Sequence, residues 1–317
     1  MRAMVTPKFG SPDLFELKDI EKPSPGPGEL LVRVVASGTN PVEAKIRKTG
    51  YWGGIKPPVI LGYDVSGIVE QVGDGVNEFV NGDEVFYTPE IDPTRSGSYA
   101  EYNVVAASIV THKPSSLSHI EAAAVPLAGG TAYEAIIRRL RISIGETILI
   151  HGGAGGVGSF AVQLARGSGA RVLATASKSN QETLHSLGVD VAIDYANQDP
   201  FEIALKETGG RGVDAVFDTV GGDIIQRSLA ATRPFGRLAG ILGPGGDLTQ
   251  AYRKNCTYYG VMLTRERKRL EILKAILEQR KISPLIDRII PLEKVSEAHH
   301  RLDSGHGRGK IVLKIGK

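Results

Sequence analysis

Glycine is concentrated in one short run, residues 151–165, which reads HGGAGGVGSFAVQLA. Within this run, Gly153, Gly155 and Gly158 have the spacing G-x-G-x-x-G. Because glycine loses more backbone entropy on folding than other residues, the run indicates either a flexible loop or a turn that closely approaches a ligand. In the second case, the first glycine permits a tight turn, the second lets the backbone approach a pyrophosphate, and the third lets a helix pack on a strand.

The flanking residues favour the ligand-binding turn. TILIH (147–151) is an apolar run typical of a strand, and FAVQLARGSG (160–169) predicts a helix. Strand, glycine turn and helix in this order form the context that a dinucleotide-binding fingerprint requires. The helix N-terminus would offer free N–H groups and a partial positive charge to phosphates. The predicted cofactor-binding residues of the turn are Gly153, Ala154, Gly155, Gly156, Val157 and Gly158.

The end of the next predicted strand indicates which dinucleotide binds. Sites that prefer NAD usually carry an acidic residue about 20 positions after the turn, where it holds the ribose 2′-OH. Here the strand ends in ATASKSN (174–180), which has no Asp or Glu but offers Ser177, Lys178 and Ser179. Since an ammonium attracts a 2′-phosphate, we expect NADPH to be preferred to NADH. The alternative is that Lys178 is a solvated loop lysine.

The elements around the turn predict an α/β protein with two kinds of domain. Residues up to about 119 contain β-branched and alternating runs separated by turn clusters, which indicates a small, partly open β-barrel. From about residue 146, strands and helices alternate, which predicts a Rossmann-type, doubly wound parallel sheet covered on both faces. The chain then returns to a helix–strand pattern that ends in KIVLKI (310–315).

Composition excludes several classes of protein. The 317 residues are 41% hydrophobic and 23% charged, which is ordinary for a globular chain of two domains. Cys256 is the only cysteine, so an intrachain disulfide framework and a cysteine-only metal site are excluded. The N-terminus lacks a signal-peptide core, and no apolar run approaches the ~20 residues of a membrane span. The net charge of +3 forms no basic patch. We therefore expect a soluble, cytoplasmic protein without nucleic-acid or membrane partners.

Several further stretches resemble the medium-chain dehydrogenase/reductase superfamily, in its zinc-independent quinone oxidoreductase branch. They are GTNPVEAKIRKTGYW (38–52), PPVILGYDVSGIVEQVG (57–73), LAGGTAYEAI (127–136) and SEAHHRLDSGHGRGKIVL (296–313). The resemblance implies a GroES-like substrate domain built from residues 1–121 and 264–317, and an NADPH-binding Rossmann domain of residues 122–263. It also implies a homodimer or homotetramer, and NADPH-dependent hydride transfer to quinones or α,β-unsaturated carbonyls.

The same resemblance implies further cofactor contacts. Tyr195 would join Lys178 around the adenosine phosphate, unless it is only an aromatic residue of an edge strand. Thr131 would contact the nicotinamide region, unless it is a helical threonine that bonds its own backbone. The loops over the ribose and nicotinamide would be formed by Val220 with Gly221 and by Leu242 with Gly243.

A comparison with zinc-dependent members of the superfamily predicts that no metal is bound. At the positions that resemble the cysteine, histidine and glutamate of the catalytic zinc site in these relatives, this chain has Asn40, Tyr63 and Asp64. An amide and a phenol are poor zinc ligands. His299 and His300 are adjacent in a predicted helix and point in different directions, so we interpret them as a partly exposed pair.

Without a metal, hydrogen-bond donors must stabilise the charge that develops on the substrate oxygen. An enone or quinone suits such a site because conjugation spreads that charge. The candidate catalytic donors are Asn40, Tyr51 and Tyr63. Their alternatives are a turn-forming asparagine, a loop anchor and a core tyrosine, respectively. Two other functions stay open: an enone reductase with little quinone activity, and an NADPH-binding structural or RNA-binding protein.

Overall fold

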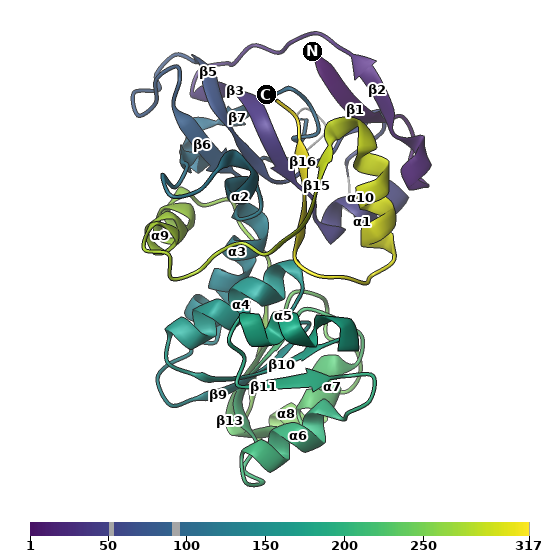
Figure 1. The fold of residues 1–317 in the computed structure, drawn as a ribbon, viewed down its shortest axis with the longest axis vertical. Helices are drawn as coiled ribbons and strands as arrows, with labels where there is room; N and C mark the ends of the chain where they lie inside the picture. Colours follow the sequence, from purple (N-terminus) through teal and green to yellow (C-terminus); the bar gives the residue numbers. More distant parts are fainter. Residues whose placement is uncertain (51–53, 91–95, 317) are drawn as a thin grey trace. The chain divides into compact units, whose positions relative to one another are not determined.

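The computed structural model describes residues 1–50, 54–90 and 96–316. The chain forms two compact units. Unit 1 comprises Met1–Ala128, Thr264–Arg280 and Pro284–Lys317, and unit 2 comprises Gly129–Leu263 and Lys281–Ser283. Both ends of the chain lie in unit 1 (Figure 1), so unit 2 is an insertion within the sequence of unit 1.

Unit 1 contains a seven-stranded mixed sheet within the described residues. Its main path runs β15 (Ile286–Pro291), β16 (Lys310–Lys314), β3 (Glu29–Gly38), β5 (Val65–Val72), β6 (Glu84–Tyr87) and β8 (Thr111–His112). The seventh strand, β7 (Tyr102–Ala106), also pairs with β3. β16 runs antiparallel to β3, with Val312 opposite Gly38, so a strand from late in the sequence completes the sheet begun by an early one.

A smaller antiparallel sheet and several helices complete unit 1. The sheet has the order β2 (Glu16–Asp19), β1 (Arg2–Thr6) and β4 (Val59–Ile60). The helices are α1 (Pro41–Thr49), α2 (His119–Ala123), α9 (Arg267–Glu278), α10 (Val295–Asp303) and the 3₁₀ turns η1 (Pro12–Leu14), η2 (Ala107–Ile109) and η5 (Leu292–Lys294). α1 begins with proline at its first position and ends at Gly50, whose φ of 68° is left-handed. α1 packs against α10.

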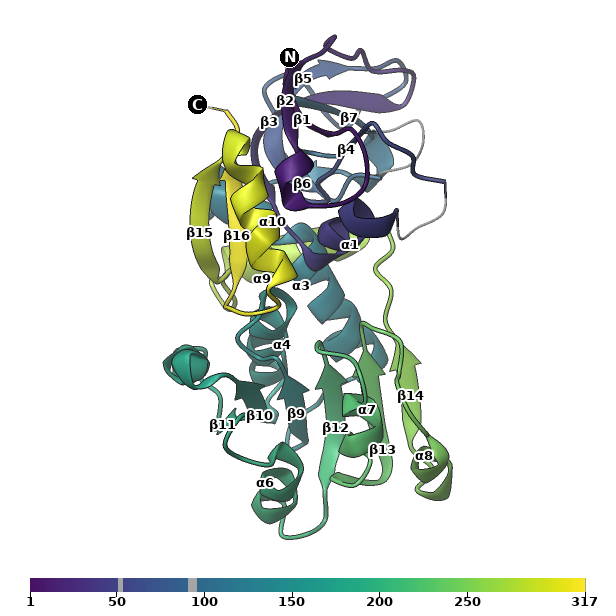
Figure 2. The same ribbon diagram turned by 90° about the vertical axis from the view of Figure 1, so that its right-hand side faces the viewer.

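Unit 2 is a six-stranded sheet in which all neighbouring strands are parallel. The order is β11 (Val191–Asp194), β10 (Arg171–Ala176), β9 (Thr147–His151), β12 (Val213–Asp218), β13 (Thr232–Gly240) and β14 (Thr257–Gly260), and Figure 2 shows the strands side by side. The predicted doubly wound parallel sheet is confirmed. The strand order reverses between β9 and β12, and ligands of such sheets bind at the carboxyl ends of the strands beside this switch point.

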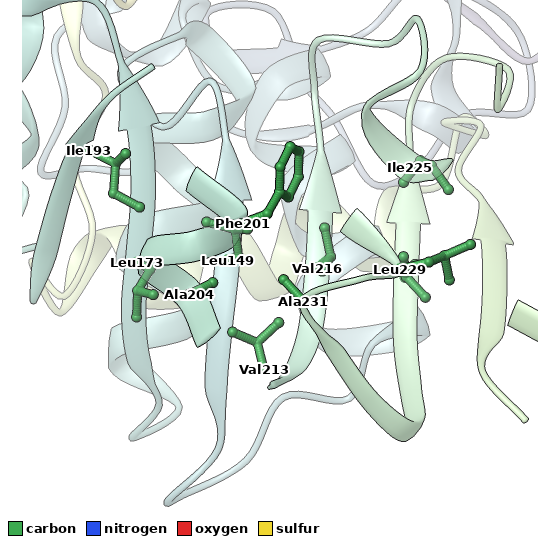
Figure 3. Packing of buried hydrophobic residues seen from close by; sticks show 11 residues of the cluster. Leu149, Leu173, Ile193, Phe201, Ala204, Val213, Val216, Ile225, Leu229 and Ala231 are labelled. Carbon is green, nitrogen blue, oxygen red and sulfur yellow. The ribbon is translucent and has the colours of Figure 1, made fainter. Parts of the chain in front are cut away.

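Helices cover the sheet of unit 2, and its central strands β9, β10 and β12 are almost entirely buried. The helices are α3 (Pro126–Tyr133) with the π-helical η3 (Glu134–Arg139), α4 (Gly156–Gly167), the 3₁₀ turn η4 (Lys178–Asn180), α5 (Gln181–Ser186), α6 (Pro200–Glu207), α7 (Ile224–Ser228) and α8 (Thr249–Arg253). Figure 3 shows Phe201 and Ala204 of α6, Ile225 of α7 and Leu229, which follows α7, packed against the strands. Each large side chain buried there contributes roughly 1.5–3 kcal/mol to the free energy of unfolding.

No helix in the described part of the chain has the length and apolar character needed to cross a membrane.

Candidate functional site

The glycine turn joins the carboxyl end of β9 to α4, in the strand–turn–helix order that the sequence predicts. The residue with a left-handed backbone is Gly152, with φ of 75°. Gly155 N–H donates to the Gly152 carbonyl at 3.0 Å, so Gly153 and Ala154 are the central residues of a turn that begins directly after His151, the last residue of β9. The role of Gly153 toward a bound cofactor stays a prediction.

Two glycines of the motif are needed because other groups approach them closely. A Cβ atom added to Gly153 would lie 2.8 Å from the Cβ of Ala174 in β10. A Cβ added to Gly158 would lie 2.0 Å from the carbonyl oxygen of Gly152. These approaches bring the start of α4 close to the strands. The first-turn N–H groups of α4, from Gly156, Val157 and Gly158, have no acceptor within the helix and can receive an anionic group.

Ser177, Lys178 and Tyr195 lie beside one another in space at the carboxyl ends of β10 and β11. Ala176 is opposite Asp194 in the parallel pairing of these strands, and Tyr195 N–H donates to the Ala176 carbonyl at 3.4 Å. Lys178 is exposed, and the Tyr195 side chain is 51% exposed. The structure therefore brings these predicted residues to the sheet edge that also carries the glycine turn, since Gly153 N–H donates to the Thr175 carbonyl at 2.9 Å.

The loops after β12 and β13 reach the same sheet edge. Asp218, the buried last residue of β12, accepts hydrogen bonds from Val220 N–H at 2.7 Å and Gly221 N–H at 3.1 Å. These bonds fold the loop that presents Val220. A Cβ on Gly221 would lie 2.6 Å from Leu242 Cδ1, so this loop packs against the loop of Leu242 and Gly243. Asp218 escaped the sequence reasoning, although a carboxylate at a strand end before a glycine pair is a recognisable signal.

Thr131 and His151 are both buried in unit 2. Thr131 lies in α3 with a relative exposure of 5%. His151 Nε2 lies 3.1 Å from Ser228 Oγ. The Ser228 hydroxyl itself donates to the Ile224 carbonyl at 2.7 Å. The imidazole therefore donates through Nε2. Burial, with a smaller contribution from the charge of Arg227, lowers the pKa of His151 to about 4, so it is neutral at physiological pH.

In unit 1, Asn40 immediately precedes α1 and is 2% exposed. Its Nδ2 donates to Glu43 Oε1 at 3.1 Å and to Asp64 Oδ2 at 2.9 Å, and its Oδ1 accepts from the Lys310 ammonium. Both amide hydrogens are thus bonded to carboxylates. The role of Asn40 as a donor to substrate stays a prediction.

Glu43 is fully buried and accepts four hydrogen bonds. The donors are Asn40 N–H at 2.6 Å, Asn40 Nδ2 at 3.1 Å, Tyr63 N–H at 2.7 Å and Tyr99 Oη at 2.7 Å. Burial raises the pKa of Glu43 to about 7, while the charge of Lys310 and these donors act in the opposite direction. Glu43 is not among the candidate residues that the sequence analysis names. The available signal was its spacing of three residues from Asn40, which is the spacing of a capping box.

A directional chain of hydrogen bonds leads to Glu43. Arg47 Nε donates to His299 Nδ1 at 3.1 Å, and because a guanidinium can only donate, the histidine proton must be on Nε2. His299 Nε2 is 3.2 Å from Tyr99 Oη, so it can donate to that oxygen, and the Tyr99 hydroxyl in turn donates a hydrogen bond to Glu43 Oε2. Burial lowers the pKa of His299 to about 3. Because His299 is buried, the sequence interpretation of a partly exposed histidine pair is wrong for this residue.

Tyr63 lies beside the same carboxylate, because its N–H donates to Glu43 Oε1. Its ring faces the guanidinium of Arg265, with Cζ 5.1 Å from the ring centroid. Burial raises the pKa of Tyr63 to about 12, although Arg265 acts to lower it. The structure therefore brings Asn40 and Tyr63 together around Glu43. Tyr51 lies outside the described residues.

The donor set at Asn40, Tyr63 and Asp64 does not fit zinc. The Asn40 carbonyl oxygen is held by an ammonium, and the Tyr63 phenol keeps its proton far above neutral pH. Asp64 accepts from Lys310 Nζ at 2.9 Å and from Leu127 N–H at 2.7 Å. In the described ranges, no group of three or more His, Cys, Asp or Glu residues could hold a metal ion.

Two family models match the chain. Residues 26–115 match the alcohol dehydrogenase GroES-like domain, and residues 187–313 match the zinc-binding dehydrogenase family. The chain is 35% identical over 326 residues to 2-methylene-furan-3-one reductase of Solanum lycopersicum, covering 99% of this chain and 79% of that protein. It is 32% identical over 327 residues to the quinone oxidoreductase of Homo sapiens, covering 99% and 98%. It is 32% identical over 323 residues to the chloroplastic NADPH-dependent alkenal/one oxidoreductase of Arabidopsis thaliana, covering 99% and 79%.

Solved structures give the same result at the level of the fold. A quinone oxidoreductase from Coxiella burnetii superimposes with a TM-score of 0.90 at 32% identity, covering 99% of both chains. An NAD-dependent alcohol dehydrogenase superimposes with a TM-score of 0.93 at 31% identity, covering 100% of both chains. The similarity therefore extends over both units.

Proposed function

Since this chain belongs to the quinone oxidoreductase branch of the medium-chain dehydrogenase/reductase superfamily, we propose that it is an oxidoreductase that transfers hydride from a nicotinamide dinucleotide to quinones or α,β-unsaturated carbonyls. The observation that carries the proposal is the close-packed glycine turn at the switch point of the parallel sheet in unit 2. The similarity to reductases of both substrate classes over 99% of the chain supports the choice of substrates.

Lys178 supports NADPH as the preferred cofactor. Its exposed ammonium lies at the carboxyl end of β10, together with the hydroxyl of Ser177 and the phenol of Tyr195. A 2′-phosphate at this position would gain charge-assisted hydrogen bonds that the 2′-hydroxyl of NADH cannot make. The name of the Arabidopsis relative, which includes NADPH, agrees with this preference.

The remaining cofactor-binding residues follow from the strand-end geometry. We assign the pyrophosphate to the N–H groups of Gly156, Val157 and Gly158, at the start of α4. The ribose and nicotinamide would lie against the loops of Val220, Leu242 and Gly243, with Thr131 as a further contact. When bound, the cofactor supplies the hydride, and the protein supplies binding and orientation.

Tyr63 is the donor that we propose for the substrate oxygen in unit 1. A phenol whose pKa is about 12 keeps its proton at neutral pH, so it can donate to an oxygen that becomes negatively charged. Hydride reaches the β-carbon of an activated alkene or a ring carbon of a quinone, and the resulting enolate or hydroquinone anion then takes up one proton. The misfit of the Asn40, Tyr63 and Asp64 donors to zinc supports a reaction without metal.

The test follows NADPH oxidation at its absorbance band with a small quinone and a short enone in parallel. NADH is run beside each acceptor, and a chelator is included in one series. We expect oxidation that prefers NADPH and is unchanged by the chelator, with the better acceptor identifying the main substrate class. Tight NADPH binding without oxidation of NADPH by either acceptor would contradict the proposal.

A second candidate is an enone reductase with little quinone activity, because two of the relatives carry the names of alkene-reducing enzymes. The same assay separates the two candidates, since this one requires turnover of the enone and little turnover of the quinone.

A further inference from the structure

Lys310, the first residue of β16, has a buried ammonium surrounded by oxygen atoms. Its relative exposure is 3%. Nζ donates to the Thr39 carbonyl at 2.8 Å, to Asp64 Oδ2 at 2.9 Å and to Asn40 Oδ1. An ammonium has three N–H groups, so these three acceptors use all of them. A cation held by three inward-facing oxygens has the arrangement of a bound ion, although here the ion is a side chain.

The groups around Lys310 carry more negative than positive charge. Asp64 is fully buried, and Glu43, also fully buried, is joined to it through the Nδ2 group of Asn40. Arg47 is the other fully buried cation of this region, but it is paired with Asp303 at 2.5 Å. A buried carboxylate without a counter-ion is strongly unfavourable. Lys310 is therefore the cation that compensates the Glu43–Asn40–Asp64 cluster.

We propose that the Lys310 ammonium does in this cluster what a divalent cation would do: it neutralises the carboxylates and fixes the orientation of the Asn40 amide. The family model that matches residues 187–313 is named for zinc binding, whereas the oxygens at this position already hold an internal cation. Lys310 is a positioning residue, because it acts through Asn40 and Asp64.

The orientation of Asn40 follows from this contact. Its carbonyl oxygen points to the only group of the cluster that donates and carries positive charge, so its Nδ2 must face the two carboxylates. Without Lys310, the described contacts leave that carbonyl oxygen without its donor and Asp64 without its ion-pair partner. The two carboxylates still hold the Nδ2 end of the amide, but its carbonyl end is no longer fixed by a charged donor.

Chemical rescue tests the proposal. Lys310→Ala leaves space for a small amine beside the three oxygens, and we expect a lower Tm that rises again with millimolar methylammonium or ethylammonium chloride. Tetramethylammonium chloride has no N–H group and should leave the Tm of the variant unchanged. Lys314→Ala is the matched control, because Lys314 is an exposed lysine of the same strand, and its Tm should respond to none of these salts.

Lys310→Met separates the charge from the packing of the aliphatic stem. Methionine keeps most of the stem but has no ammonium, so we expect a lower Tm and no rescue by amines. A wild-type Tm for Lys310→Met, together with no amine effect on Lys310→Ala, would overturn the proposal in favour of simple packing.

A double variant keeps the proposal testable if the single variants fail to fold. Lys310→Met combined with Asp64→Asn removes one charge of each sign, and we expect it to be more stable than Lys310→Met alone. Equal or lower stability of the double variant would contradict the role of Lys310 as counter-ion.

The metal content of the purified wild-type protein gives an independent readout. After dialysis against zinc chloride and then buffer, we expect no retained zinc by atomic absorption. One equivalent of zinc that is lost in Asp64→Asn would overturn the proposal. None of these measurements depends on turnover, so failure of this inference and failure of the proposed reductase activity are distinguishable.

Discussion

At the scale of single residues, the phenol of Tyr63, which we propose as the donor to the substrate oxygen, gives the most direct test of activity. Tyr63→Phe removes the proposed donor but keeps the ring beside Arg265. We expect kcat to fall by roughly 10²-fold, the usual effect of losing one oxyanion donor. Because the pKa of Tyr63 is about 12, the ratio of wild-type to variant rates should stay constant between about pH 6 and 9. Tyr102→Phe, a half-buried tyrosine of unit 1, is the control, and an equal loss in both variants would contradict the role of Tyr63.

The second prediction at the scale of single residues concerns Lys178 and the preference for NADPH over NADH. Lys178→Glu places a carboxylate where we propose a 2′-phosphate, so kcat/KM for NADPH should fall about tenfold or more, and that for NADH should change little. The comparison is steady-state kinetics with both cofactors at one fixed acceptor concentration. Lys206→Glu makes the same charge change at an exposed position of α6 and should alter neither value. Equal losses with NADPH and NADH would show that Lys178 does not select the cofactor.

The sequence indicated the positions of candidate site residues at strand ends where their neighbours in space are also near in the chain. The glycine spacing indicated the turn, and Ser177 and Lys178 follow from the end of the next strand. Lys310 was missed for a physical reason: its importance depends on contacts between residues far apart in the chain, such as the contact of Lys310 with Asn40. Nothing local in KIVLKI shows that its first lysine is buried, because that depends on the pairing of β16 with β3.

At the scale of elements, α4 contains one glycine position where a side chain would clash and one where there is space for a side chain. A Cβ on Gly158 would lie 2.0 Å from a backbone oxygen, whereas a Cβ on Gly167 of the same helix meets nothing within 4 Å. Gly158→Ala should lower the free energy of unfolding by roughly 1–3 kcal/mol and weaken NADPH binding. Gly167→Ala should raise the free energy of unfolding by roughly 0.5–1 kcal/mol and leave binding unchanged.

Urea unfolding and NADPH titration by fluorescence measure both variants of α4. The two substitutions are chemically identical, so any difference between them reports the packing of the helix start. Equal stability and equal NADPH affinity for Gly158→Ala and Gly167→Ala would contradict the close approach seen at Gly158.

The contact of β9 with α7 through His151 gives a pH dependence of stability. The pKa of His151 is about 4 in the folded chain, against an ordinary value of 6.5. Between these values the unfolded chain binds a proton that the folded chain does not, so His151 lowers stability as the pH falls from 6.5 to 4. His151→Gln should therefore reduce the dependence of the free energy of unfolding on pH by about 1.4 kcal/mol per pH unit in this range.

Urea unfolding at half-unit pH steps measures this slope. His306→Gln, at an exposed position of unit 1, is the control and should keep the wild-type slope. Glu43 acts in the opposite sense in both proteins, because its raised pKa of about 7 favours the folded chain as the pH falls. The prediction therefore concerns the difference between variant and wild type, and identical slopes would contradict it.

The elements themselves were largely predictable. Continuous apolar runs such as TILIH and VDAVFD alternate with amphipathic helices, and such runs are stable only in a parallel sheet covered on both faces. The π-helical segment Glu134–Arg139 was not predictable, because its hydrogen-bond register has no distinct sequence pattern and depends on packing against α4 and β13. That one unit combines both ends of the chain was expected only from the family resemblance, since strand pairing across the whole chain cannot be derived from local periodicity.

At the scale of the whole molecule, the edge strand β14 predicts self-association. β14 pairs only with β13 among the described strands, and its exposed neighbours include Met262 and Tyr252, which are 65% and 86% exposed. An open apolar edge favours pairing with a second chain, so we propose a homodimer through this edge. Met262→Lys should shift the monomer–dimer equilibrium at least tenfold toward monomer.

Sedimentation velocity over a range of concentrations tests this dimer. Ile144→Lys, at another exposed apolar position of unit 2, is the matched control and should leave the equilibrium unchanged. A wild-type protein that sediments as a monomer at every concentration would remove the proposal.

The insertion of unit 2 within unit 1 has a consequence for the order of events during translation. Unit 2 is almost contiguous in sequence, so residues 129–263 can begin to fold while later residues are still being joined. Unit 1 cannot complete its folding at that stage, because Thr39 hydrogen-bonds to Ile311, which lies 272 positions later in the chain and has not yet been synthesised. Synthesis proceeds at roughly 5–20 residues per second, so the edge of β3 that pairs with β16 stays unpaired for many seconds. During this interval Asp64 has no counter-ion, and the arrival of Lys310 both closes the sheet and neutralises the carboxylate. The nascent chain is therefore most exposed to misassembly and to chaperone capture in its N-terminal portion, long after that portion has left the ribosome.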